Sequence, residues 1–111
     1  MANDDMHVIM YKILAYLYDC MKKGEEPQNS MISYDSDLLG IPAAYWNQIM
    51  AQMVELGLVK GIAVRYYDNS PTVLISKPYV TLEGVQFMQE NSMMSKALKF
   101  LKESKAALPF I

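Results

Sequence analysis

Glycine and proline divide the middle of this chain into segments whose order few folds share. Residues 36–39 form a short helical pattern that stops at Gly40, and Pro42 opens a longer amphipathic stretch that ends at Gly57. Glycine just past a helix end and proline at a helix start are strong boundary signals. A β-prone run begins immediately afterwards, at Leu58. A short helix, a turn, a longer helix and then a strand are typical of a winged helix-turn-helix, in which the longer helix usually forms a reading surface.

The patterns before this unit predict one long helix and one short strand. Apolar residues spaced by three and four indicate a first helix over about 4–23, with Met21 on its apolar face. A polar loop follows, and then a short strand over 31–33. The helix-turn-helix itself is predicted over about 35–56, with Pro42 at the first position of its second helix.

The patterns after this unit predict a hairpin and further helices. Two β-prone runs joined by turn-forming residues at 67–71 indicate a wing over about 58–77, and Pro78 is expected to end it. C-terminal helices are expected over about 81–107, the first of them capped by Thr81. The fold class is therefore α+β: a winged helix-turn-helix with an additional C-terminal helix.

Size and composition set the scale of the fold. A chain of 111 residues forms one domain, so residues 1–111 are predicted to be a single winged-helix domain. Hydrophobic residues make up 52% of it, including ten methionines and eight tyrosines. This excess has two interpretations: methionine fills a closely packed core, or apolar surface is kept for a second subunit.

Charge is unevenly spread along the chain. The net charge is −2, but residues 1–58 hold three Lys against eight Asp and Glu, whereas residues 59–111 hold seven Lys and Arg against four. The whole chain is therefore not an electrostatic nucleic-acid binder, although its second half can supply a local basic face.

The chain lacks the usual marks of secretion, membrane insertion and catalysis. A single cysteine, Cys20, excludes an internal disulfide, and no apolar stretch approaches the roughly 20 residues that cross a bilayer. The acidic N-terminus is unlike a secretory signal, so we expect a cytoplasmic protein with no membrane partner. His7 and Cys20 alone cannot complete a zinc site. We expect no metal, no cofactor and no enzymatic activity.

The second helix and the wing supply the candidate nucleic-acid contacts. Asn and Gln can bond bidentately to adenine in the major groove, and backbone N–H groups at a helix start can hold a phosphate. Lys and Arg of a wing can contact phosphates. The candidate contacts are Ala44, Asn47, Gln48, Lys60 and Arg65, with Asn69 and Ser70 at the wing tip.

The same surface also has a second interpretation. The helix over 42–56 contains no Lys or Arg and ends with Glu55, while Asp35 and Asp37 precede it. Double-stranded DNA is bound largely by neutralising its phosphates, which this face does poorly. The alternative is a protein-interaction module without DNA binding. A continuous positive strip from this helix to the wing favours DNA, whereas a neutral or negative helix with an exposed apolar patch favours a protein partner.

The last predicted helix carries a stripe of lysines. Lys96, Lys99, Lys102 and Lys105 recur every three residues, followed by an apolar tail. The stripe is either an ordinary solvated face or a surface that contacts phosphates or a partner. We expect a homodimer that packs through its terminal helices, which uses the surplus of apolar residues.

Particular segments of the chain are similar to a known family. Residues 81–91, followed by 95–97 and a lysine-rich helix, resemble the C-terminal part of the YjcQ-like proteins, small winged-helix proteins of Firmicutes and their phages. The turn at 68–71 and the segment 57–61 are similar as well, and the resemblance covers about residues 11–105.

The resemblance implies the fold and a phage or mobile-element setting. It carries no established biochemical activity, so no binding residue is transferred from it. The loop over 24–30 and the apolar tail after residue 106 depart from the family pattern, which leaves the assembly state open. The expected function is a small phage- or mobile-element-associated transcriptional regulator that binds DNA, and the alternative is a phage or host accessory protein that binds a protein.

Overall fold

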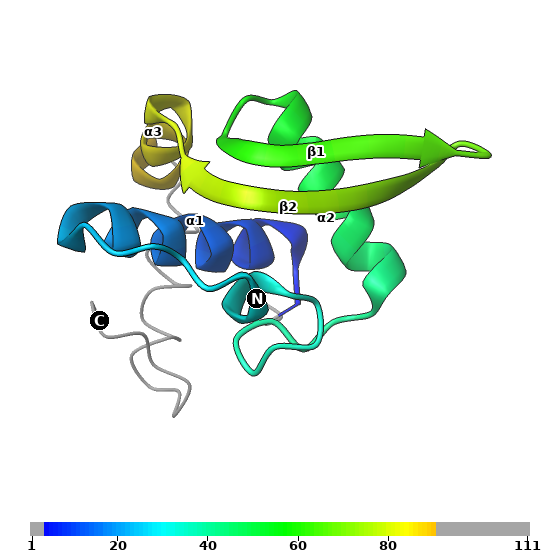
Figure 1. The fold of residues 1–111 in the computed structure, drawn as a ribbon, viewed down its shortest axis with the longest axis horizontal. Helices are drawn as coiled ribbons and strands as arrows, with labels where there is room; N and C mark the ends of the chain where they lie inside the picture. The colour runs from blue at the N-terminus through cyan, green and yellow to red at the C-terminus, as the bar shows by residue number, and fades with distance from the viewer. Residues whose placement is uncertain (1–3, 91–111) are drawn as a thin grey trace.

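The computed structural model describes residues 4–90 and shows an α+β arrangement (Figure 1). Within these residues the chain forms three α-helices, a short 3₁₀ helix and one antiparallel hairpin. The elements in chain order are α1 (Met6–Lys23), η1 (Asn29–Ile32), α2 (Ala43–Glu55), β1 (Val59–Tyr67), β2 (Ser70–Val80) and α3 (Leu82–Glu90). This arrangement is compatible with a winged helix. The helix predicted over 95–107 and its lysines lie outside the described residues.

α1 is the central helix, since α2, β2 and α3 all contact it. Most of its circumference is therefore buried, and even Lys12 is only 5% exposed. Met21 was predicted on the apolar face, but it is 46% exposed because it lies in the last turn, beyond the packed part of the helix. Gly24 ends the helix as predicted, in a left-handed conformation with φ 69° that glycine adopts without strain.

The segment between α1 and α2 differs from the prediction in two places. The strand expected over 31–33 is instead the 3₁₀ helix η1, where the N–H of Met31 donates to the carbonyl of Gln28 at 3.0 Å and Ile32 is fully buried. The short helix expected before Gly40 is a single turn, in which the Ser36 carbonyl accepts from Gly40 at 2.9 Å. Sequence pattern alone does not distinguish these tight turns from regular elements because each is only a few residues long.

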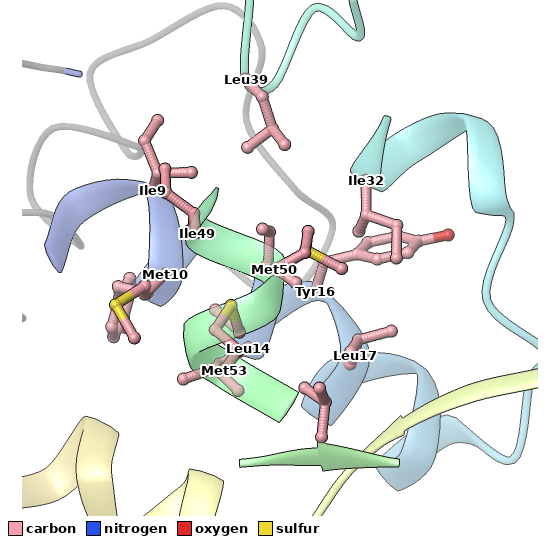
Figure 2. Packing of buried hydrophobic residues seen from close by; sticks show 14 of the residues in the cluster. Ile9, Met10, Leu14, Tyr16, Leu17, Ile32, Leu39, Ile49, Met50 and Met53 are labelled. Carbon is pink, nitrogen blue, oxygen red and sulfur yellow. The ribbon is translucent and has the colours of Figure 1, made fainter. Parts of the chain in front are cut away.

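α2 begins one residue later than predicted. Pro42 is its N-cap, in an extended conformation with ψ 144°, rather than its first helical residue. The apolar pattern predicts the burial of Trp46, Met50 and Met53 correctly, but Leu56, expected on the same face, is 56% exposed, and Ala51, expected on the opposite side, is buried. The indole Nε1–H of Trp46 donates to the Ile32 carbonyl at 2.8 Å, which fixes η1 against the helix. Met50 and Met53 are fully buried among side chains from α1 and η1 (Figure 2). These methionines pack the core, as the first interpretation of the composition proposed.

The hairpin is longer and its turn is tighter than predicted. Asp68 and Asn69 form a two-residue turn with φ values of 51° and 67°, the backbone that a type I′ turn requires. Ser70 therefore begins β2 instead of lying in the turn. Pro78 does not end the strand, because it falls within an irregularity opposite Gly61 where the regular hydrogen-bond ladder is interrupted.

α3 is attached to the end of the hairpin by Thr81, which was predicted to cap it. The Thr81 hydroxyl donates to the Gly57 carbonyl at 2.6 Å and accepts from the N–H of Gly84 at 3.1 Å. One side chain thus joins the end of α2, the end of β2 and the start of α3. Gly84 is required by close packing, since an added Cβ would lie 2.7 Å from a methyl carbon of Val80.

Candidate interaction surface

The hairpin has one buried face and one exposed face. Three cross-strand pairs have buried or half-buried side chains: Val59 with Val80, Ile62 with Ile75 and Val64 with Val73. Four other pairs are exposed on both strands, Lys60 with Tyr79, Ala63 with Leu74, Arg65 with Thr72 and Tyr67 with Ser70, so they lie on the opposite side of the sheet from the core. We call this side the outer face; its residues are Lys60, Ala63, Arg65, Tyr67, Ser70, Thr72, Leu74 and Tyr79.

The bulge at Gly61 places both predicted wing cations on this face. Lys60 and Arg65 are five positions apart, and residues an odd number apart lie on opposite faces of a regular strand. Here Val59 and Ile62 are both buried although they are three positions apart, so the alternation of faces is interrupted at Gly61, where the register of the two strands also shifts. Gly61 has φ 79°, a conformation that strains other residues. The bulge thereby brings Lys60 and Arg65 to one side.

Apolar side chains share this face with the cations, with Tyr79 opposite Lys60 and Leu74 between Lys60 and Arg65. Leu74 is 48% exposed and Tyr79 is 47% exposed, and Tyr67 is exposed further toward the turn. Contiguous exposed apolar side chains rimmed by polar ones are characteristic of interaction sites. The sequence analysis did not select Leu74 or Tyr79. The alternation of side chains along β2 predicts that the strand has two different faces. It does not show which of these faces remains exposed.

The hairpin carries a net positive charge, whereas the rest of the described chain carries a net negative charge. Residues 59–80 hold three Lys and Arg against one acid, Asp68. The other described residues hold three Lys against ten Asp and Glu. The cations predicted for the wing therefore stand out in sign from their surroundings, which favours an acidic partner at this element.

The α2 candidates lie elsewhere. Ala44 and Gln48 are exposed and Asn47 is half-buried, on a helix that carries no cation. α2 packs against the hairpin, passing behind it in Figure 1, and its buried residues join the same core as the inward-facing strand residues. The exposed side of α2 therefore does not merge with the outer face. Asp35 and Asp37, both exposed, lie in the turn before the helix.

The tip of the hairpin holds the last two candidates. Asn69 occupies a left-handed turn position, which asparagine tolerates better than most residues. The turn conformation is therefore sufficient to explain an asparagine at this position. Ser70 pairs with Tyr67 and is exposed on the outer face. The structure thus gathers Lys60, Arg65 and Ser70 on one surface and separates them from the α2 residues.

The buried polar groups maintain the fold. The ammonium of Lys12 donates to the Leu38 carbonyl at 3.2 Å, and burial lowers its pKa. Burial likewise raises the pKa of the Cys20 thiol, which makes it a poor nucleophile. His7, exposed on α1, stacks on Phe87 with ring centroids 6.3 Å apart. Residues 4–90 contain no group of three or more His, Cys, Asp or Glu arranged to hold a metal.

Comparison with protein families identifies the relationship. The family model described as YjcQ protein matches residues 11–107. This chain belongs to the YjcQ family. The YjcQ match includes α2, the hairpin and α3, so the resemblance seen in the sequence is confirmed. No curated protein and no solved structure matches the chain. None of the helices in residues 4–90 has the length and hydropathy needed to cross a bilayer.

Proposed function

We propose that this YjcQ-family chain is a winged-helix protein that binds another protein through the outer face of its hairpin. The order of α1, α2, hairpin and α3 supports the winged-helix assignment. The observation that carries the function is the exposure of Leu74 and Tyr79 on the same face as Lys60 and Arg65, with Tyr79 opposite Lys60 and Leu74 between the two cations. Tyrosine and leucine flanked by charge supply apolar contact area and orientation together, as interface centres do.

The charges support a protein partner over duplex DNA. A protein that holds DNA tightly neutralises roughly six to ten phosphates, and the hairpin offers three cations. The helix that would enter the major groove offers none and is preceded by Asp35 and Asp37. A negative helix entering the groove would repel the phosphates on both sides of it.

DNA reading through α2 is the second candidate, and the exposed Gln48 favours it. Glutamine on an exposed recognition helix can bond to adenine in the major groove. In either case the family setting supports a cytoplasmic accessory or regulatory protein of a phage or mobile element, acting without a cofactor. The predicted homodimer remains part of this proposal, and the C-terminal segment that was predicted to form its interface lies outside the described residues.

Two matched variants distinguish these functions. Leu74→Asp and Gln48→Glu each add one negative charge at an exposed position, the first on the outer face and the second on α2. Proteins captured from host extract by the wild-type chain should be lost with Leu74→Asp and kept with Gln48→Glu. The opposite pattern contradicts the proposal.

DNA binding is measured on the same proteins by fluorescence anisotropy at about 50 and 200 mM salt, the range over which phosphate contacts lose most of their affinity. The proposal predicts no sequence-selective binding at either salt concentration. Binding that prefers certain fragments and is abolished by Gln48→Glu would assign the protein to DNA reading instead.

A further inference from the structure

The two-stranded sheet leaves the second edge of β1 without a partner strand in residues 4–90. An unpaired edge presents a row of backbone N–H and C=O groups that can pair with another strand. β1 contains no proline, whereas β2 contains Pro71 and Pro78, which lack the donor that strand pairing needs. The loop after α1 also approaches β2, with Glu26 4.0 Å from the Lys77 ammonium. β1 is therefore the edge suited to pairing.

The outer half of β1 holds the accessible backbone groups. Tyr67 and Ser70 flank the two-residue turn, so in a hairpin of this type they are hydrogen-bonded to each other. Because hydrogen-bonded positions alternate along a strand, Val64 and Tyr66 direct their N–H and C=O groups to the open edge. The neighbouring residues Ala63 and Arg65 are exposed, which leaves room for a strand beside them.

The side chains of β1 specify the chemistry of that strand. Arg65 lies on the outer face near the middle of the accessible stretch, and Lys60 lies on the same face further along. An added strand would place every second side chain on this face, next to the cations. Opposite charges on neighbouring strands are stabilising, so acidic side chains fit there. The remaining side chains would lie beside Val64, which is half-buried and suits an apolar neighbour.

We infer that β1 binds an extended segment of a partner protein in which acidic and apolar residues alternate, by addition of a strand to its open edge. This inference rests on the proposed function and specifies its partner class and binding mode. A second copy of this chain fits the edge less well. Pairing two β1 strands would bring Lys60 and Arg65 of both copies onto one face, where like charges repel.

The test uses the full chain and a synthetic probe. A capped peptide of alternating glutamate and valine, about eight residues long as strands commonly are, is titrated into the ¹⁵N-labelled protein. The amide signals of residues 63–67 should shift. A peptide with lysine in place of glutamate should not bind. Strand pairing uses the N–H groups of alternate peptide residues. N-methylation of one residue type, the valines or the glutamates, should therefore abolish binding, whereas N-methylation of the other type should leave binding unchanged.

Protein variants supply the matching controls. Arg65→Glu should weaken peptide binding about tenfold or more, because it replaces an attraction with a repulsion across the pair. Lys22→Glu makes the same charge change on α1 and should leave binding within about twofold, since only long-range charge differs. Tyr66→Pro removes an edge N–H and should abolish binding. The amide spectrum of this variant shows whether its hairpin still forms. The methylated peptides test the same requirement for edge hydrogen bonds on the wild-type chain.

Each failure has a separate meaning. Strand addition is overturned if Arg65→Glu and both N-methylations leave peptide binding unchanged. It is also overturned if the amide signals that shift on titration belong to α2. Self-association through β1, detected by light scattering as a doubled mass that Tyr66→Pro abolishes, also overturns it in favour of a second copy. If the peptides fail while Leu74→Asp still prevents partner capture, strand addition is wrong and the proposed function stands. If capture survives Leu74→Asp, the proposed function itself is wrong.

Discussion

Gly61 controls the shape of the proposed binding surface, so substituting it should have a large and specific effect. Its backbone has φ 79°, and an added Cβ would overlap the carbonyl oxygen of Lys77 and lie 2.6 Å from the carbonyl carbon. Both obstacles belong to the backbone of β2, which cannot move aside as a flexible side chain can. Gly61→Ala therefore combines conformational strain with a clash. Gly57, with φ 73° and nothing within 4 Å of an added Cβ, has the strain alone.

The two substitutions separate these contributions. A left-handed alanine costs about 1–2 kcal/mol of folding free energy, which is the expected effect of Gly57→Ala. Relieving the clash at Gly61 requires β2 to move away, which disrupts about two hydrogen bonds worth about 1 kcal/mol each. Gly61→Ala should therefore destabilise the protein by about 3–4 kcal/mol, roughly 2 kcal/mol more than the control.

Urea unfolding followed by circular dichroism measures this difference. With a slope of roughly 2 kcal/mol per molar urea, the midpoint for Gly61→Ala should lie about 1 M below that of Gly57→Ala. Gly61→Ala should also weaken partner capture under folding conditions, because the bulge aligns Lys60 with Arg65. Equal midpoints for the two variants would refute the argument that backbone contact at the bulge requires glycine.

Substitutions at three further residues test the rest of the fold. Trp46→Phe removes the N–H that bonds to the Ile32 carbonyl and leaves that buried acceptor unpaired. The free energy of unfolding, measured with urea and circular dichroism, should therefore fall by about 1–3 kcal/mol. An unchanged midpoint would argue against this bond. Thr81→Val removes the hydroxyl that caps α3 and should cost about 1–2 kcal/mol by the same assay, whereas Thr81→Ser should retain most of it. Burial raises the pKa of the Cys20 thiol, so the unfolded chain loses this proton first and stability should fall as pH rises above about 8.5; Cys20→Ala should flatten that fall, and an unchanged slope would contradict it.

Local chemistry was sufficient to predict several elements. Gly24 ends α1 and Thr81 begins α3 because a left-handed glycine and a capping hydroxyl act on the backbone within a few residues. The failures were segments whose conformation depends on distant contacts. Ile32 reads as part of a strand, but its burial against α1 and α2 and the bond from Trp46 to its carbonyl favour a 3₁₀ turn. Pro78 reads as a strand end, and only the pairing of β1 with β2 shows that it falls at a bulge.

The candidate site was predictable in part for the same reason. Lys60 and Arg65 were selected as wing residues, and both are exposed there. Their common face could not be derived from spacing, because they are five positions apart and the irregularity at Gly61 is a property of the paired strands. The exposure of Leu74 was also outside local reasoning, since it depends on α2 covering the opposite face of the sheet.

Site-specific photo-crosslinking in host cells tests the hairpin as the contact surface most directly. A benzophenone amino acid is placed at Thr72, exposed on the outer face beside Arg65, or at Gln48, exposed on α2. We predict a defined protein adduct from position 72 and none from position 48. Protein or DNA adducts from position 48 together with none from position 72 would contradict the proposal and identify α2 as the functional surface.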